Sequence, residues 1–306
     1  MRFAEIGQQL RAYRMESGLR AEEIAARLGV SRAALYRYEK GEVIKLDTVK
    51  RLAELLKVSP LSLLGIGVEY YSRPSGFFER VRQIEENADQ ILQVFGPACY
   101  LTTSDTFDTA MAEGLAHLIE QAGEERHSVR TTADQVLTLL SARKRNYKQR
   151  HPSIIAIVSE TAIRTFLEHG ILSAARLPDE LRARCRDVAA VEIENIAELM
   201  EAEPMGLQFG LLRDHELTSG FTILRAGDRA TLAVNPFRAD GVPTHPTGVA
   251  MITGADEAVS AHQRVAEAMW RGATKGKAGA ARLRELLAAH GRDGRPTTLH
   301  ETPRAA

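Results

Sequence analysis

The chain contains few of the residues from which disulfide-rich or metal-binding proteins are built. It has two cysteines in 306 residues, Cys99 and Cys185, which lie far apart in the sequence. Such a pair forms neither a disulfide framework nor a zinc-ligand pattern. We expect two free thiols, and the sequence leaves open whether either responds to oxidants. The nine histidines are scattered, and no two lie three or four residues apart, so no metal site is predicted.

Long apolar runs and an overall excess of charge are also missing. No run approaches the roughly 20 residues that span a bilayer, and the N-terminus enters a charged amphipathic pattern directly. We therefore predict no membrane partner and a cytoplasmic location. The formal net charge is zero. However, residues 1–60 carry 12 basic and eight acidic side chains, an excess typical of a nucleic-acid-binding region.

Signatures of catalysis are absent as well. The sequence has no glycine-rich phosphate loop, no GxSxG element and no HExxH element. We predict no catalytic residue and no cofactor, and we expect that the protein is not an enzyme. An enzyme with a regulatory N-terminal region is the weaker alternative.

The N-terminal region shows a dense helical pattern. Apolar residues recur at helical spacing over 3–17, 20–28, 31–38 and 47–57, which predicts four helices. Gly18, Gly29 and Gly41 end the first three, and Ser31 is a suitable N-cap for the third. These residues predict an all-α domain over 1–60.

The rest of the chain contains segments with helical apolar spacing and segments with the short apolar runs of strands. We expect a linker over 61–76, a larger α/β domain over 77–290 and a disordered tail over 291–306. The predicted strands are 97–102, 153–158, 205–212, 220–224, 231–235 and 249–252, with a hairpin turn at 226–228. The predicted helices are 77–94, 105–122, 131–149, 160–169, 179–202, 256–270 and 280–289.

The segment 19–41 has the pattern of two helices joined by a tight turn. Ala25 is small where the helices cross, and Gly29 permits the positive φ of the turn. Val30 and Leu35 are apolar where the second helix of the pair packs back on the first. The outward positions of that helix are Arg32, Ala33, Tyr36 and Arg37, side chains suited to contact with base edges.

This segment resembles the Cro/phage-repressor (XRE) helix-turn-helix family, whose fold is lambda-repressor-like. The resemblance covers about 55 residues. The resemblance implies that the third helix enters the major groove of double-stranded DNA. The matching contact positions are Ser31, Arg32, Ala33 and Arg37, with Arg32 or Arg37 on guanine. It also implies that Tyr36 contacts the backbone or a thymine methyl group and that Lys40 and Lys45 contact phosphate.

Two further positions follow from the resemblance. Arg14 and Glu39 occupy the places of a structural ion pair between the first and third helices. Arg20 stands where the family usually has a Ser, Thr or Asn cap, so the second helix is expected to begin less stably and Arg20 to reach phosphate instead.

The larger domain offers weaker indications. Thr103, Ser104 and Asp105 follow a predicted strand, where they either line an effector pocket or cap a helix. The basic run 143–150 is either an anion site or a solvated helix face. The segments 227–232, 249–252 and 265–270 are similar to phospholipase-D-like domains, but the His-x-Lys pattern of that family is absent. This similarity implies an inert relative used for sensing or dimerisation.

Together these features predict a two-domain transcription regulator. The helix-turn-helix domain would bind a palindromic operator as part of a homodimer or higher homo-oligomer, and the larger domain would respond to an unknown small-molecule effector. Repression is our working assumption, although the sequence does not fix the sign of regulation. The alternative is a protein-interaction module or antitoxin-like adaptor.

Overall fold

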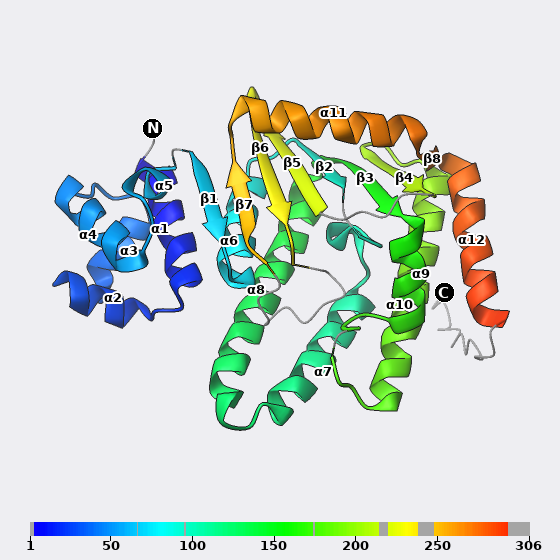
Figure 1. Cartoon of the computed structure of the whole chain (residues 1–306), viewed down its shortest axis with the longest axis horizontal. Coiled ribbons are helices and arrows are strands. Elements are labelled where there is room, and N and C mark those ends of the chain that lie inside the picture. The colour runs from blue at the N-terminus through cyan, green and yellow to red at the C-terminus, as the bar shows by residue number, and fades with distance from the viewer. Residues whose placement is uncertain are drawn as a thin grey trace.

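The computed structural model describes residues 3–65, 67–94, 96–173, 175–213, 220–237 and 248–292. It has a small helical part at one end, residues 3–65, which we call the head (Figure 1). The remaining described residues form a larger α/β part, which we call the body (Figure 1). The tail predicted over 291–306 lies outside the described residues except for 291 and 292, the last two residues of the final helix.

The head consists of five helices. They are α1 (Phe3–Ser17), α2 (Ala21–Leu28), α3 (Arg32–Glu39), α4 (Leu46–Leu56) and the short α5 (Pro60–Leu63). Leu10, Ile24, Leu35 and Leu52 are fully buried at its centre, one from each of the four longer helices. The apolar spacing in the sequence predicted those four helices to within about two residues.

The segment expected to be a linker is folded instead. Besides α5 it contains β1 (Val68–Tyr71), which pairs antiparallel with β7 at the edge of the sheet. The helix α6 (Pro74–Glu85) then begins at Pro74, where a missing backbone N–H costs nothing. Pro74, Ser75 and Gly76 are buried, so these residues mark a tightly packed helix start and not a flexible connection.

An eight-stranded sheet forms the centre of the body, in the order β1-β7-β6-β5-β2-β3-β4-β8. Its other strands are β2 (Gln90–Val94), β3 (Ser153–Ser159), β4 (Leu207–Leu212), β5 (Gly220–Ala226), β6 (Arg229–Asn235), β7 (Ala250–Thr253) and β8 (Thr274–Lys275). β2, β3 and β4 are parallel, and all other neighbours are antiparallel. The predicted hairpin turn joins β5 to β6, with Gly227 at positive φ.

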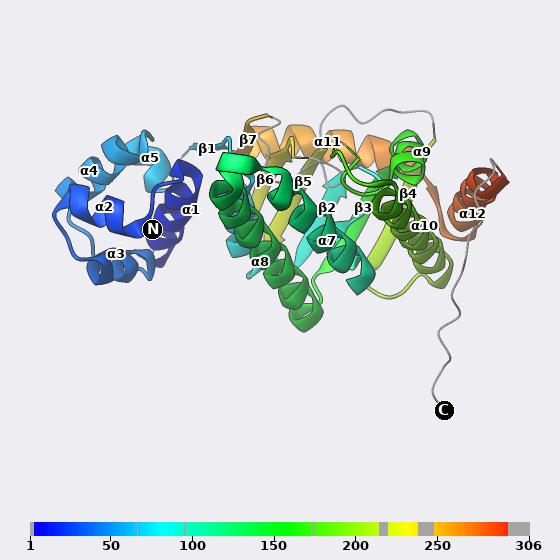
Figure 2. The ribbon, with the colours of Figure 1, turned by 90° about the horizontal axis from the view of Figure 1, so that it is seen from below.

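Helices cover both faces of this sheet (Figure 2). α7 (Asp105–Gln121), α8 (Arg126–Arg150) and α10 (Asp179–Ala202) pack on one face, with α6 against α8, and α11 (Asp256–Gly272) packs on the other. α9 (Glu160–His169) and α12 (Gly276–Arg292) pack beside α10 at the end far from the head. The α11 face buries Val94, Ile157 and Ile223 of the sheet beneath Val259 and Ala266 of the helix.

Two predicted elements were wrong. The helix expected over 77–94 ends at Glu85, and Ile91 and Leu92 belong to β2. A turn separates α6 from β2. After this turn the Asp89 amide donates to the Arg225 carbonyl (2.7 Å), a bond to the neighbouring strand and not to the helix. The strand expected over 97–102 is a turn followed by a short 3-10 helix, Tyr100–Thr102. Within the described part of the chain, no helix has the length and apolar character needed to cross a bilayer.

Candidate nucleic-acid interface

The turn between α2 and α3 has the geometry that the sequence indicated. Gly29 adopts a left-handed conformation with φ of 70°. The Val30 amide donates back to the Ala25 carbonyl (3.0 Å), which closes the end of α2. Ala25 and Leu35 are buried, so α3 is fixed against α2.

α3 presents one side to the core and the other to solvent. Its first turn is capped by Ser31, whose hydroxyl accepts from the Ala34 amide (3.1 Å). Ala34 and Leu35 are buried, whereas Ser31, Arg32, Ala33 and Arg37 are exposed and Tyr36 is half-buried. The structure therefore places the predicted contact positions together on the outer side of α3.

The two arginines predicted to contact bases are held by exposed acids. Arg32 pairs with Glu22 (2.6 Å) and also donates to the Tyr36 hydroxyl (3.1 Å). Arg37 lies 3.4 Å from Glu42. The arginine side chains are 57% and 60% exposed, and such pairs contribute at most about 1 kcal/mol. Both guanidinium groups can exchange these partners for a guanine edge at little cost.

Other basic residues surround this surface. Lys40 follows the last turn of α3, and Lys45 precedes α4; both are exposed. Arg20 precedes α2, and its side chain is 79% exposed. Arginine has no hydrogen-bond acceptor, so it cannot cap the helix as serine does. Instead the Glu23 carboxylate accepts from the Arg20 amide (2.9 Å), which supplies one half of a capping box.

The predicted structural ion pair is confirmed. Arg14 of α1 donates through Nη2 to Glu39 Oε2 (3.1 Å) at the end of α3, and both side chains are largely buried. This pair fixes α3 against α1 and keeps Glu39 away from the exposed side of α3.

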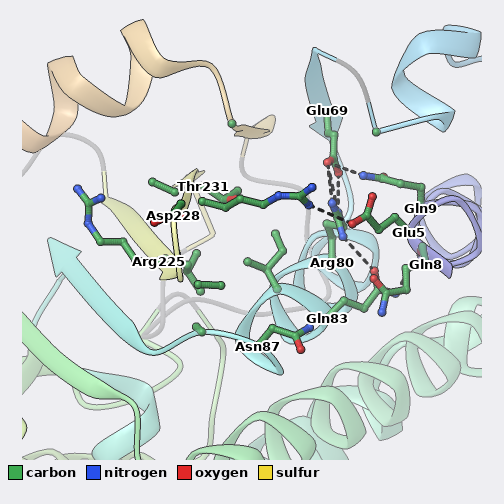
Figure 3. A pocket seen from close by; sticks show the side chains of 18 of the residues that line it. Glu5, Gln8, Gln9, Glu69, Arg80, Gln83, Asn87, Arg225, Asp228 and Thr231 are labelled. Atoms are coloured by element: carbon green, nitrogen blue, oxygen red, sulfur yellow. Dashed lines mark hydrogen bonds and ion pairs between the residues drawn. The ribbon is translucent and has the colours of Figure 1, made fainter. Parts of the chain in front are cut away.

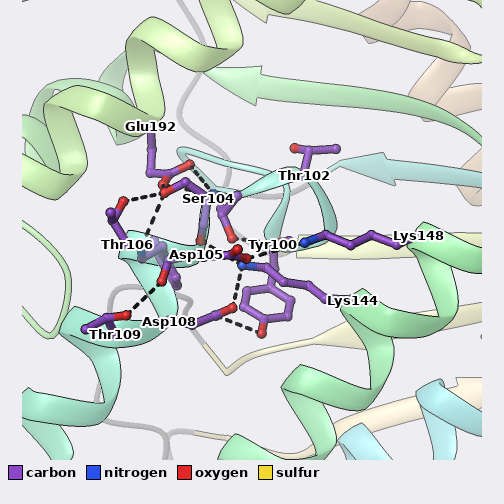
Figure 4. A network of polar contacts seen from close by, with 12 residues as sticks. Tyr100, Thr102, Ser104, Asp105, Thr106, Asp108, Thr109, Lys144, Lys148 and Glu192 are labelled. Carbon is purple, nitrogen blue, oxygen red and sulfur yellow. Dashed lines mark hydrogen bonds and ion pairs between the residues drawn. The ribbon is translucent and has the colours of Figure 1, made fainter. Parts of the chain in front are cut away.

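The polar residues predicted as an effector site belong to a network of polar contacts that joins α7, α8 and α10 (Figure 4). Ser104 caps α7 and donates through its amide to Glu192 of α10 (3.1 Å), which confirms the helix-cap interpretation for this residue. Thr103 donates to the Tyr100 carbonyl (2.8 Å), and Asp105 lies at the surface beside Lys148 (3.4 Å). Burial raises the pKa of Glu192, while the hydrogen bonds from Ser104 oppose that rise. Effector binding at these residues stays a prediction.

The basic run 143–150 is divided between interior and surface. Arg143 pairs with Glu85 (2.8 Å), and the buried Lys144 pairs with Asp108 (2.7 Å). These two residues are internal partners of acids and not part of a solvated face. Arg145 and Arg150 are exposed.

Sequence reasoning missed a second polar region, where the head meets the body (Figure 3). Glu69 of β1 is buried and accepts from Arg80 of α6 (3.0 Å) and from Gln9 of α1 (2.6 Å). Glutamate, arginine and glutamine are usually exposed, so nothing in the neighbouring sequence indicates that these side chains are buried. Among the described residues, no group of three or more His, Cys, Asp or Glu side chains is placed to hold a metal ion.

Comparisons with known proteins concern the head. Residues 5–63 match a family model described as "Helix-turn-helix domain". Over 62 residues the chain is 44% identical to a protein of Pyrococcus horikoshii named "Putative HTH-type transcriptional regulatory protein PH1808". That match covers 19% of this chain and 20% of the relative's length. No solved structure matches the chain. The N-terminal region is thus a helix-turn-helix domain, and the two matches support a DNA-binding regulator.

Proposed function

We propose that the chain is a sequence-specific transcription regulator of the Cro/repressor type whose α3 reads operator DNA. The observation that carries this proposal is the exposure of Arg32, Ala33 and Arg37 on one side of a helix whose other side is buried. The helix-turn-helix match and the name of the Pyrococcus relative support it.

The chemistry of the surface fits a division of labour on DNA. Arginine at the start of a recognition helix can donate two hydrogen bonds to guanine O6 and N7. Lys40, Lys45 and Arg20 lie at the flanks of this surface, where lysine and arginine position a domain on phosphates without reading sequence. The basic excess of residues 1–60 adds a field that attracts DNA.

We further propose that the body dimerises, that it responds to a small-molecule effector, and that it has no catalytic role. A two-fold dimer presents two copies of α3 to half-sites about one helical turn apart, roughly 34 Å, so the operator is a palindrome. An effector acts by favouring one arrangement of the heads over another. Light scattering of the purified chain, alone and on operator DNA, tests the dimer.

Fluorescence anisotropy tests DNA recognition. Labelled DNA from upstream of the chain's own gene is compared with a scrambled duplex of equal length, at about 50 and 200 mM salt. We expect preference for the upstream DNA at both salt concentrations and weaker binding at the higher one. Equal binding to both duplexes would count against a specific regulator. A second protein that co-purifies at fixed stoichiometry would then favour the interaction-module alternative.

A further inference from the structure

Arg32, the first residue of α3, is held by two neighbours although its side chain is 57% exposed. Its Nη1 lies 2.6 Å from Glu22 Oε1 of α2. Its Nε and Nη2 donate to the Tyr36 hydroxyl at 3.3 and 3.1 Å. An unpartnered arginine on a surface samples many rotamers, so these two contacts from different helices restrict the guanidinium before any ligand arrives.

The two partners differ in how firmly the fold holds them. Tyr36 lies one helical turn after Arg32, and its half-buried ring packs against the core of the head. The central carbon of the guanidinium lies 5.3 Å from the centroid of that ring. Glu22 belongs to α2, which the buried Ala25 and Leu35 fix against α3. Tyr36 is thus the rigid partner, and Glu22, which is 54% exposed, adds the opposite charge.

These contacts leave Arg32 enough free donors to bind a base. A guanidinium group has five N–H donors. The Tyr36 hydroxyl accepts from two of them, and with one more given to Glu22 at Nη1, two remain, one on each terminal nitrogen. Guanine presents two acceptors, O6 and N7, in the major groove. Arg32 can therefore bind guanine without releasing either partner.

Arg37, the other exposed arginine of α3, is held less firmly. Its side chain lies 3.4 Å from Glu42 and forms no other hydrogen bond or ion pair with the part of the chain that the structure describes. No ring or hydroxyl group fixes its guanidinium there, so Arg37 has more conformational freedom to lose when it binds. The two arginines thus differ in how far each is ordered before it meets DNA.

We propose that Tyr36 and Glu22 are positioning residues, which hold Arg32 in the orientation that binds one guanine in each operator half-site. The Tyr36 hydroxyl then serves Arg32 and does not contact DNA. Ordering a long side chain on binding costs affinity, and a side chain that is ordered beforehand avoids part of that cost. This inference rests on the proposed DNA-binding function, and it makes Arg32 the more selective of the two arginines for guanine.

Competition anisotropy with single-base operator variants tests the role of Tyr36. Arg32→Ala first identifies the base pair that Arg32 reads, as the position where discrimination between bases falls. We expect Tyr36→Phe, which removes only the hydroxyl, to lower discrimination at that base pair by about threefold to tenfold. The matched control Tyr38→Phe removes a hydroxyl of the same helix that forms no hydrogen bond with the described residues, and it should discriminate like the wild type. Unchanged discrimination by Tyr36→Phe would overturn the proposal.

A double-mutant cycle separates positioning from direct contact with DNA. If Tyr36 acts only through Arg32, then Tyr36→Phe should change operator affinity by less than about twofold in the Arg32→Ala background. An equal loss of affinity with and without Arg32 would mean that Tyr36 contacts DNA itself, and it would overturn the proposal.

Glu22 is tested against an exposed carboxylate elsewhere in the head. Glu22→Gln and Glu54→Gln each remove one negative charge, so both should strengthen binding to all DNA sequences. Only Glu22→Gln should also lower discrimination at the base pair that Arg32 reads. Equal discrimination by the two variants would exclude Glu22 as a positioning residue.

A measurement without DNA keeps the two proposals distinguishable. Nuclear magnetic resonance of the full chain reports the Nε–H signal of Arg32, which is identified by its loss in Arg32→Lys. We expect a signal apart from those of free arginine side chains in the wild type, and a shift toward them in Tyr36→Phe. A signal at the free position in the wild type would overturn the positioning of Arg32 and leave the regulator intact. Equal binding of the wild type to operator and scrambled DNA would count against the regulator and leave the resonance result intact.

Discussion

At the scale of single residues, Arg32 and Arg37 are the side chains best placed to read DNA. Each is exposed on α3 and pairs with a surface acid, and Arg32 also donates to the Tyr36 hydroxyl. We expect Arg32→Ala or Arg37→Ala to lose about 1–3 kcal/mol of operator affinity and to relax specificity at one base pair. Competition anisotropy with single-base operator variants measures both effects.

The matched control is Arg130→Ala, which removes an exposed arginine from α8 of the body. This variant should bind like the wild type. If Arg32→Ala and Arg37→Ala also bind with full affinity and specificity, then α3 is not the reading helix.

Lys40 should behave differently from these arginines. It lies beyond the last turn of α3, where a lysine contacts phosphate and not a base edge. We expect Lys40→Ala to weaken binding to all sequences alike and to lower the slope of log affinity against log salt by about one unit. Salt titrations on operator and scrambled DNA measure the slope. A loss confined to the operator would instead place Lys40 on a base.

The two cysteines should be inert in the folded protein. Burial raises the pKa of both the Cys99 and the Cys185 thiol to about 11. Since only the thiolate is nucleophilic, we expect no reaction with a disulfide reagent at pH 8 until the chain is unfolded. Rapid labelling of the native protein would contradict this and revive a redox role.

The same pKa values fix the sign of a pH effect on stability. The folded state holds these two protons more tightly than the unfolded state, whose thiols have their ordinary pKa of about 9.0. The stability that the two protonated thiols contribute is complete below pH 9 and is lost as the pH rises toward about 11. Urea midpoints of the wild type and Cys99→Ala between pH 8 and 10.5 should therefore converge as the pH rises.

At the scale of elements, α1 of the head completes the start of α6 in the body. No side chain of its own segment caps α6. Instead, Glu16 accepts from the amides of Ser72 (2.6 Å) and Arg73 (2.9 Å). Gly76 makes this approach possible, because a Cβ there would lie 2.8 Å from Glu16 Cβ. A carboxylate at this position satisfies free amides and faces the positive end of the helix dipole.

Removing that carboxylate should therefore destabilise the body through a residue of the head. We expect Glu16→Ala to lower the free energy of unfolding by about 0.5–2 kcal/mol. Glu54→Ala, which removes an exposed carboxylate of α4, is the control and should have little effect. Chemical unfolding followed by Trp270 fluorescence reports on the body, where the chain's single tryptophan lies. Equal midpoints for the two variants would contradict the capping role of Glu16.

The elements also show why sequence patterns failed where they did. The helices of the head were predictable because each has a long apolar face and a clear end. By contrast, Ile91 and Leu92 continue the helical spacing of α6 yet lie in a five-residue strand, a length at which periodicity does not separate the two structures. β1 escaped notice because it is short and contains the buried Glu69, which finds its partners on α1 and α6.

The candidate interface and the polar region around Glu69 differ in the same way. Ser31, Arg32 and Arg37 are local to one turn and one helix, so their spacing in the sequence predicts their arrangement. Gln9, Glu69 and Arg80 come from α1, β1 and α6. Only the tertiary packing brings them together, and no short-range pattern indicates it.

At the scale of the whole molecule, the head packs against the body and is not tethered to it. Tyr13 of α1 stacks on Tyr71 of β1 with ring centroids 5.4 Å apart. Nearby, Arg11 of α1 pairs with the buried Glu79 of α6 (2.9 Å). Burying a carboxylate is costly unless its partners remain in place, so the two parts favour one relative orientation.

This packing predicts that the head and the body unfold together. Hydrogen exchange followed by mass spectrometry, at increasing urea, should give peptides of α1–α4 the same opening free energy as peptides of β2 and β3. Loss of protection in the head at lower urea would show an independent domain.

Arg80→Met should make the head lose protection at lower urea than the body. The change leaves Glu69 buried beside α1 without its charge partner, at a cost of about 3–5 kcal/mol. Arg80→Lys keeps the charge and should separate the two transitions less.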